Sequence, residues 1–158
     1  WWDPFTLKAL VFGKLDTNVA LARFCNNFSS MLASGVPILQ ALDIVGSTSG
    51  NYVIDSSSKR VGRLVERGYR LADSMSTEKI FPNMLVQMVA IGEDSGAIDK
   101  MLSSAGRAYD EEAQSMAKQL TSLLEPLMIL FLGVVVGFMV VALYMPMFSM
   151  FDAINGQA

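Results

Sequence analysis

The sequence predicts an all-α protein: a six-helix cytoplasmic bundle whose last helix continues into a C-terminal transmembrane helix. Three observations predict it. Apolar residues recur at helical spacing over 17–124, no stretch alternates with period two, and residues 126–151 contain no charge. We therefore expect a juxtamembrane segment at 1–16, a helical domain at 17–124, a membrane span at 125–148 and a short periplasmic tail at 149–158.

Glycine and proline residues mark the ends of the first three helices. The first helix gathers its apolar side chains on one face, at Leu21, Phe24, Cys25, Phe28, Met31 and Leu32. Gly35 ends this helix and Pro37 begins a second, which reaches Gly50, following the preference for proline at helix starts and glycine after helix ends. Asn51 is placed to cap a third helix, which runs to Gly68.

The remaining helices follow without long connections. A short helix is expected at 71–78 and a fifth at 81–96. The sixth begins at Ala97 and meets no proline until Pro126, so we expect it to run directly into the apolar segment.

The apolar segment 126–151 has the length of a membrane span. About 20 consecutive apolar residues cross a bilayer core as a helix, and a buried core helix rarely stays apolar on every face for this long. All 12 lysines and arginines precede it, the last being Lys118, which predicts a cytoplasmic bundle and an external C-terminus. The unpaired Cys25 is consistent with a cytoplasmic location.

The first two residues are tryptophans. Trp1 and Trp2 next to Pro4 suit the headgroup region of a membrane, so we expect the chain to follow an earlier span that this sequence does not contain. The alternative is that these side chains cover the end of the bundle.

Composition excludes several classes of function. Without histidine, the Ser-His-Asp and Cys-His nucleophile systems and His-based metal sites cannot form. One cysteine allows neither an internal disulfide nor a CxxC motif. A net charge of −3 argues against general nucleic-acid binding. We expect no catalytic residue, no cofactor and no nucleic-acid partner.

Four cations define the candidate partner-binding surface. Lys59, Arg63, Arg67 and Arg70 share one stripe of the third helix, provided that the helix extends to Arg70. Such a stripe can dock on an acidic partner or on anionic lipid. The alternative is a solvated face steadied by Asp55–Lys59 and Glu66–Arg70 pairs.

Two acidic groups allow alternative interpretations. Glu93, Asp94 and Asp99 could supply oxygen ligands to a cation such as Ca²⁺, but they lack a regular D-x-D-x-D loop, and Asp99 also suits the first turn of a helix. The run 110–112 is most simply a solvated acidic face, which can also attract a basic partner.

Four residues of the apolar segment concern membrane packing. Glu125 and Pro126 lie where the helix enters the bilayer, so the carboxylate is at headgroup depth or paired with another span. Gly133 and Gly137 form a small-xxx-small pair that permits close approach of a second helix.

Several ordered motifs together resemble one family, the F domain of bacterial type II secretion and type IV pilus platform proteins (GspF/PilC). These motifs are ALARF at 20–24, ASGVPILQALDIV at 33–45, FPNMLVQMVAIGEDSGAIDKML at 81–102 and SLLEPLMILFLGVVVGFMVVALYMP at 122–146. Members contain two related six-helix domains and three spans, and this chain resembles the second domain with the last span.

The resemblance implies a non-enzymatic inner-membrane platform. It implies a hexameric cytoplasmic assembly ATPase, pilins or pseudopilins, other inner-membrane assembly proteins, lipid and further copies of itself as partners. A single-span subunit of an unrelated transporter or pore complex is the alternative, but GVVVGFMVV offers no polar lining. A membrane enzyme using Glu93, Asp94 or Glu125 would lack a phosphate loop and an accompanying nucleophile.

Overall fold

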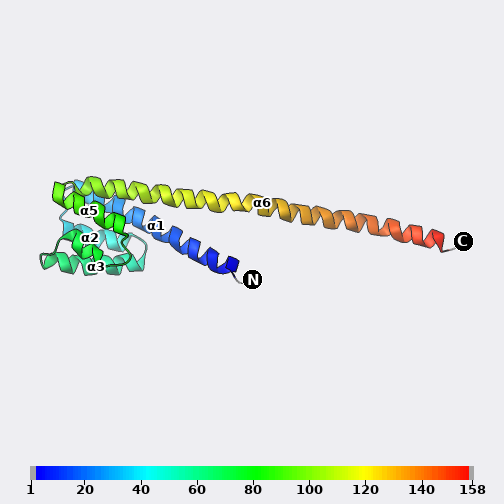
Figure 1. Cartoon of the computed structure of the whole chain (residues 1–158), viewed down its shortest axis with the longest axis horizontal. Helices are drawn as coiled ribbons and strands as arrows, with labels where there is room; N and C mark the ends of the chain where they lie inside the picture. The colour runs from blue at the N-terminus through cyan, green and yellow to red at the C-terminus, as the bar shows by residue number, and fades with distance from the viewer. Residues whose placement is uncertain (1–2, 157–158) are drawn as a thin grey trace. The chain divides into compact units, whose positions relative to one another are not determined.

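The structure is a computed structural model that describes residues 3–156, with side chains from residue 13 onward. The described chain is all-helical and contains no strand, which confirms the predicted class (Figure 1). Its six helices are α1 Asp3–Ala33, α2 Ile38–Thr48, α3 Tyr52–Glu66, α4 Leu71–Ser76, α5 Asn83–Ser95 and α6 Ile98–Asn155. The chain divides into two compact units between Met116 and Ala117.

The first unit has one hydrophobic core, to which all six helices contribute. Its largest fully buried side chains are Phe24, Phe28, Leu21, Leu42, Ile54, Leu71, Met75, Leu85 and Leu102. The rings of Phe24 and Phe28 are centred 5.6 Å apart, and Phe81 packs 5.3 Å from Phe24. The apolar face predicted for the first helix is thus the face that α1 buries.

Helix α1 lies antiparallel to the part of α6 that belongs to the first unit. The Ser29 hydroxyl donates to the carbonyl of Asp99 at 2.6 Å, and the Asn18 amide lies 3.8 Å from the Met116 sulfur. Between them a Cβ at Gly106 would collide with the Asn26 side chain, so glycine lets the two helices approach closely.

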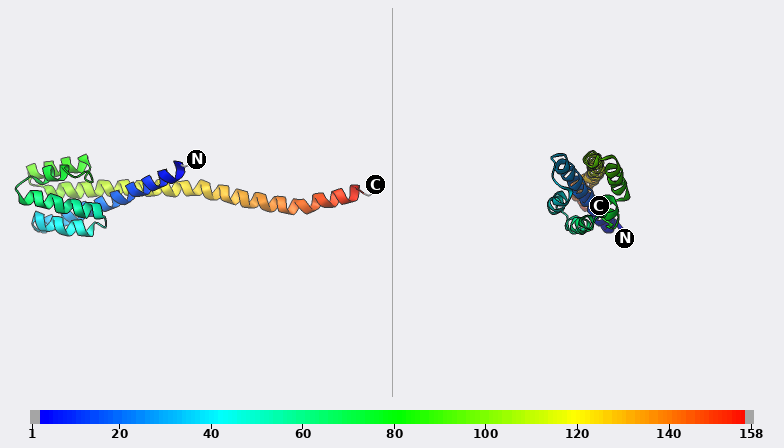
Figure 2. Two further views of the ribbon diagram at one scale, coloured as in Figure 1. Left: turned by 90° about the horizontal axis from the view of Figure 1, so that it is seen from below. Right: turned by 90° about the vertical axis from the view of Figure 1, so that its left-hand side faces the viewer.

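Helix α2 packs on both α1 and α3, and the helices of the first unit run side by side along a common direction (Figure 2). Asn51 caps α3 as predicted, because its side-chain oxygen accepts from the N–H groups of Val53 at 2.9 Å and Ile54 at 3.3 Å. A Cβ at Gly46 of α2 would lie 2.8 Å from the Ser58 Cβ of α3. The two helices therefore approach each other closely at Gly46.

Helix α1 begins at Asp3, so the segment 1–16 is helical from residue 3. Its position beside a membrane stays a prediction, as do the boundaries expected at 124 and 148. Trp1 and Trp2 lie outside the described residues, and the expectation about them is untested.

The second unit is the rest of α6, from Ala117 onward. Nearly all of its side chains are exposed, and the helix passes through Pro126 and Pro146 without a break in its assignment. Within the described residues α6 is the one helix long and apolar enough to cross a membrane. The prediction that the sixth helix and the apolar segment form one continuous helix is confirmed.

Candidate partner-binding surface

Three exposed cations form the basic face: Lys59 and Arg63 of α3, and Arg67, the C-cap residue directly after it. The Lys59 ammonium lies 2.9 Å from an Asp55 carboxylate oxygen, which confirms the predicted i,i+4 pair. This hydrogen bond raises the pKa of Lys59, so the side chain stays charged. Among the described residues Arg63 and Arg67 form no ion pair, and their guanidinium groups are available to a partner.

The prediction that Arg70 continues this stripe is wrong. Helix α3 ends at Glu66, and Gly68 has φ +93°, a left-handed conformation that turns the chain away from the helix axis. Arg70 instead precedes α4, where its guanidinium lies 2.6 Å from Asp94 and 3.8 Å from Glu93. The predicted Glu66–Arg70 pair is therefore absent.

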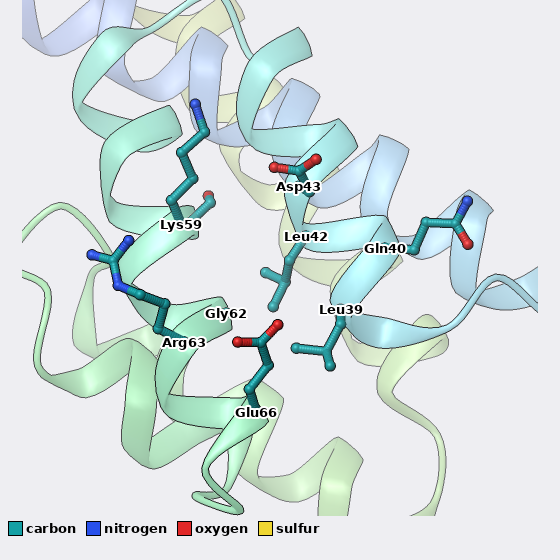
Figure 3. A pocket seen from close by; sticks show the side chains of 9 residues that line it. Leu39, Gln40, Leu42, Asp43, Lys59, Gly62, Arg63 and Glu66 are labelled. Carbon is teal, nitrogen blue, oxygen red and sulfur yellow. The ribbon is translucent and has the colours of Figure 1, made fainter.

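A groove of about 480 Å³ lies between α2 and α3, beside the basic face (Figure 3). It is lined by Leu39, Gln40, Leu42, Asp43, Ser58, Lys59, Gly62, Arg63 and Glu66. Lys59 and Arg63 extend along its α3 side, while Asp43 comes from α2. Leu39 is 39% exposed, so the groove offers apolar surface together with charges of both signs. Such a surface suits a protein segment better than a small polar molecule.

Gly62 keeps part of this groove open. It lies inside α3, its φ is not positive, and a Cβ there would have no atom of the chain within 4 Å. Glycine inside a helix costs about 0.5–1 kcal/mol relative to alanine, and here neither packing nor backbone geometry requires it. A larger side chain would enter the groove without disturbing the core.

Glu93 and Asp94 both bind residues at the start of α4. The Glu93 carboxylate accepts from the N–H groups of Leu71 at 2.7 Å and Ala72 at 2.9 Å, and so caps α4, which has no side-chain cap of its own. Asp94 holds Arg70. Among the side chains that the structure describes, from residue 13 to 156, no three acidic or cysteine groups gather as a metal site would require.

A second ion pair fixes the other end of α4. The Arg60 guanidinium donates to both oxygens of Glu78 at 2.7 Å, and the Ser57 hydroxyl donates to Glu78 at 2.9 Å. These bonds, chiefly that from Arg60, lower the pKa of Glu78. Local spacing in the sequence does not indicate this pair, because its members stand 18 residues apart.

The two buried groups with reactive potential are both held neutral. Cys25 is fully buried, and desolvation raises the pKa of its thiol to about 12. Tyr109 is 3% exposed, and burial raises its pKa to about 12; its hydroxyl has no hydrogen-bond partner within the described part of the chain. A neutral buried thiol is a poor nucleophile.

The predicted membrane residues lie on the exposed surface of the second unit. Glu125 and Pro126 fall within α6, as do Gly133 and Gly137. A Cβ at either glycine would meet nothing within 4 Å, so this chain by itself gives no reason for glycine there. The acidic run 110–112 is exposed on α6 of the first unit, which is compatible with a solvated face.

A family model and individual relatives among known proteins both match this chain over most of its length. Residues 24–146 match the model of a protein family described as type II secretion system (T2SS), protein F. The chain is also 39% identical, over 155 residues, to the type IV pilus assembly protein PilC of Myxococcus xanthus (strain DK1622), covering 98% of this chain and 37% of that protein.

Two relatives from Pseudomonas aeruginosa show how the similarity divides between machines. The type IV pilus assembly protein PilC is 40% identical over 153 residues, covering 97% of this chain and 41% of the relative. The type II secretion system protein F is 31% identical over 149 residues, covering 94% and 37%. The chain therefore spans about two fifths of the length of these relatives.

Proposed function

This chain belongs to the type II secretion system protein F family, and from that premise we propose that it is part of an inner-membrane platform that couples a cytoplasmic assembly ATPase to the insertion of pilins or pseudopilins. The observation that carries the proposal is the composition of α6. One helix contains both the residues packed in the first unit and the apolar segment able to cross a membrane. A continuous helix supports transmission of a displacement, whereas a flexible linker would absorb it.

The proposed orientation puts the first unit in the cytoplasm and the C-terminus outside. All lysines and arginines precede the apolar segment, which favours this side by the positive-inside tendency. Of the two machines we propose type IV pilus assembly, because the relatives named for it are about 40% identical and the one named for type II secretion is 31% identical. The role we propose involves no catalysis by this chain.

We assign the contact with the hexameric ATPase to the basic face and the adjoining groove. Arg63 and Arg67 form no ion pair with a carboxylate in the described part of the chain. The groove supplies apolar area next to those charges, and Gly62 leaves it open. An acidic, partly apolar segment of the ATPase would complement both.

The test is charge reversal in the full protein in its host. We expect Arg63→Glu combined with Arg67→Glu to lower ATPase copurification about tenfold or more, because like charges then face each other. Lys100→Glu, at another exposed cation of the first unit, is the matched control and should leave copurification unchanged. Unchanged copurification and unchanged piliation in the double variant would reject this surface.

Substitutions at Gly62 test the contribution of the groove separately from that of the charges. Gly62→Leu should fill it and lower copurification, whereas Gly62→Ala should bind normally and unfold at a slightly higher temperature. If deletion of the whole protein left pilus number unchanged, the platform role itself would fall.

A further inference from the structure

Tyr69 exposes an aromatic side chain directly beyond the basic face. It is 60% exposed and stands two positions after Arg67. Its N–H group donates to the carbonyl of Leu64 at 3.2 Å, which brings the backbone of Tyr69 beside the residue that follows Arg63. An aromatic residue therefore adjoins the two arginines that form no ion pair in the described part of the chain.

The turn that holds Tyr69 is one that usually packs an apolar residue back on its helix. Gly68, with φ +93°, donates its N–H to the carbonyl of Val65 at 3.0 Å. Together with the bond from Tyr69 to Leu64, this forms the Schellman motif. The residue at the position of Tyr69 frequently makes an apolar contact with the last turn of the helix. Here most of the side chain stays exposed, so the core of the first unit does not account for an aromatic residue at this position.

The backbone of Tyr69 is fixed on both sides. The Schellman motif holds it to α3, and on the other side the Arg70 guanidinium lies 2.6 Å from Asp94. The N–H group of Leu71 donates to Glu93 at 2.7 Å. A side chain on a fixed turn loses little conformational freedom on binding, which lowers the free-energy cost of association. Tyrosine and arginine are also among the residue types enriched where a few side chains dominate the binding energy of an interface.

The place of Tyr69 in the first unit favours a separate protein as its partner. Through Arg70 it is tied to the last turn of α5, which ends just before α6 begins at Ile98. The chain enters this unit along α1 and leaves it along α6 at Met116, and Asn18 of α1 lies beside Met116. From Ile98 to Met116 a helix rises about 27 Å. Both connections of the unit, including the helix that leads to the apolar segment, are thus at the end away from Tyr69.

We propose that Tyr69 is the aromatic anchor of the contact with the assembly ATPase, and that its ring enters an apolar pocket of that partner rimmed by carboxylates. The identity of the partner rests on the proposed function. Carboxylates at the rim complement Arg63 and Arg67, while the ring adds apolar area that the charges alone do not supply. The contact thereby extends from the groove to the end of the first unit.

Copurification of the ATPase with the full protein from its host tests the anchor. Tyr69→Ala should lower copurification about tenfold, equivalent to about 1.4 kcal/mol of binding free energy. Tyr69→Phe retains the ring and should copurify normally. Tyr52→Ala is the matched control, because this tyrosine is 83% exposed at the opposite end of α3, and it should also copurify normally. Thermal unfolding of all three variants should match wild type, because both side chains are mainly exposed.

Photocrosslinking identifies what covers the ring. A photoreactive phenylalanine analogue in place of Tyr69 should give a product with the combined mass of this protein and the ATPase, and about tenfold less of it when placed at Tyr52. Equal yields at the two positions would overturn the anchor. So would a product formed with lipid, with another copy of the protein or within one copy.

The variant that combines Arg63→Glu with Arg67→Glu, measured in parallel, keeps this test separate from the proposed surface. Normal copurification of Tyr69→Ala beside a loss in the charge-reversed variant removes the anchor and leaves the basic face as the contact. A loss for Tyr69→Ala beside normal copurification of the charge-reversed variant does the reverse. If neither variant changes copurification, both assignments fall.

Discussion

Glycines inside the α-helices of the two units differ in how closely other atoms approach them. In the first unit Gly46, Gly92 and Gly106 have neighbours so close that a Cβ would collide with them, whereas Gly13 and Gly62 of the same unit have none within 4 Å. In the second unit Gly133 and Gly137 have no neighbour within 4 Å. The first group is explained by the chain's own packing, and the second is not. The contrast indicates which surfaces are complete within one chain and which await lipid or another helix.

The same division holds for leucine. Leu21, Leu42 and Leu85 are almost fully buried in the first unit, whereas Leu123 and Leu130 are more than 60% exposed. Burying a leucine side chain contributes about 1.5–3 kcal/mol. The first unit therefore derives its stability from its own core, and the second depends on surroundings that one chain does not supply.

The largest effect expected from a single substitution is in the aromatic core. Phe28→Ala removes a fully buried ring that packs on Phe24, and should lower the free energy of unfolding of the first unit by about 3–5 kcal/mol. Tyr52→Ala, at a ring that is 83% exposed, should change it by less than about 0.5 kcal/mol. Denaturant unfolding followed by circular dichroism in detergent measures both, and equal effects would contradict the assigned core.

One substitution made in both units tests the contrast between the glycines. Gly92→Ala places a Cβ 2.7 Å from the Cα of Ile98, where backbone must move, and should cost about 1–3 kcal/mol. Gly133→Ala should leave unfolding of the first unit within about 0.5 kcal/mol of wild type. A large loss from Gly133→Ala would show that the units depend on each other for stability.

Glu93→Gln should have an intermediate effect, because it retains an acceptor oxygen for α4 but loses the charge. We expect a loss of about 1 kcal/mol in unfolding free energy, from the weaker interaction with the helix N-terminus and Arg70. Asp94→Asn, whose side chain is 71% exposed, should cost less. If the exposed pair proved the larger of the two, Glu93 would not be the effective cap.

The smallest effect concerns pH. Because Arg60 lowers the pKa of Glu78 below its ordinary 4.5, the pair stabilises the fold above that pH, and the stabilisation is lost as pH falls through the lower, folded pKa. Glu78→Gln should thus lower the free energy of unfolding at neutral pH by up to about 1 kcal/mol, which a lower melting temperature would report. The difference should close in acid, and a difference that grows on acidification would contradict the pairing.

Local rules predicted most of the helix ends. Asn51 caps α3, and Gly35, Gly50, Gly68 and Gly96 all have the positive φ that ends a helix or turns the chain. The apolar spacing in α1 also identified the side that faces the core. These features depend on residues within one or two turns of each other, which is the range that helical periodicity covers.

Long-range contacts could not be predicted. The Arg60–Glu78 and Glu93–Leu71 bonds join residues 18 and 22 positions apart. From the sequence alone, the acidic motif around Glu93 was compatible with a cation site. The structure shows that Glu93 accepts a hydrogen bond from the N-terminus of α4. The prediction that Arg70 continues the stripe of cations was wrong for a local reason. Gly68 interrupts the helix before Arg70, and the spacing of the cations does not take this glycine into account. The groove depends on the distance between α2 and α3, which no single-helix pattern contains.

The borrowed cap of α4 has a consequence for how the first unit opens. A six-residue helix is too short to persist alone in water, and the amide protons of Leu71 and Ala72 are held by a side chain from α5. Detachment of α5 would expose those two protons and unravel α4 in the same event. Hydrogen exchange at these amides should therefore follow the exchange of α5, and the two helices should behave as one cooperative folding element.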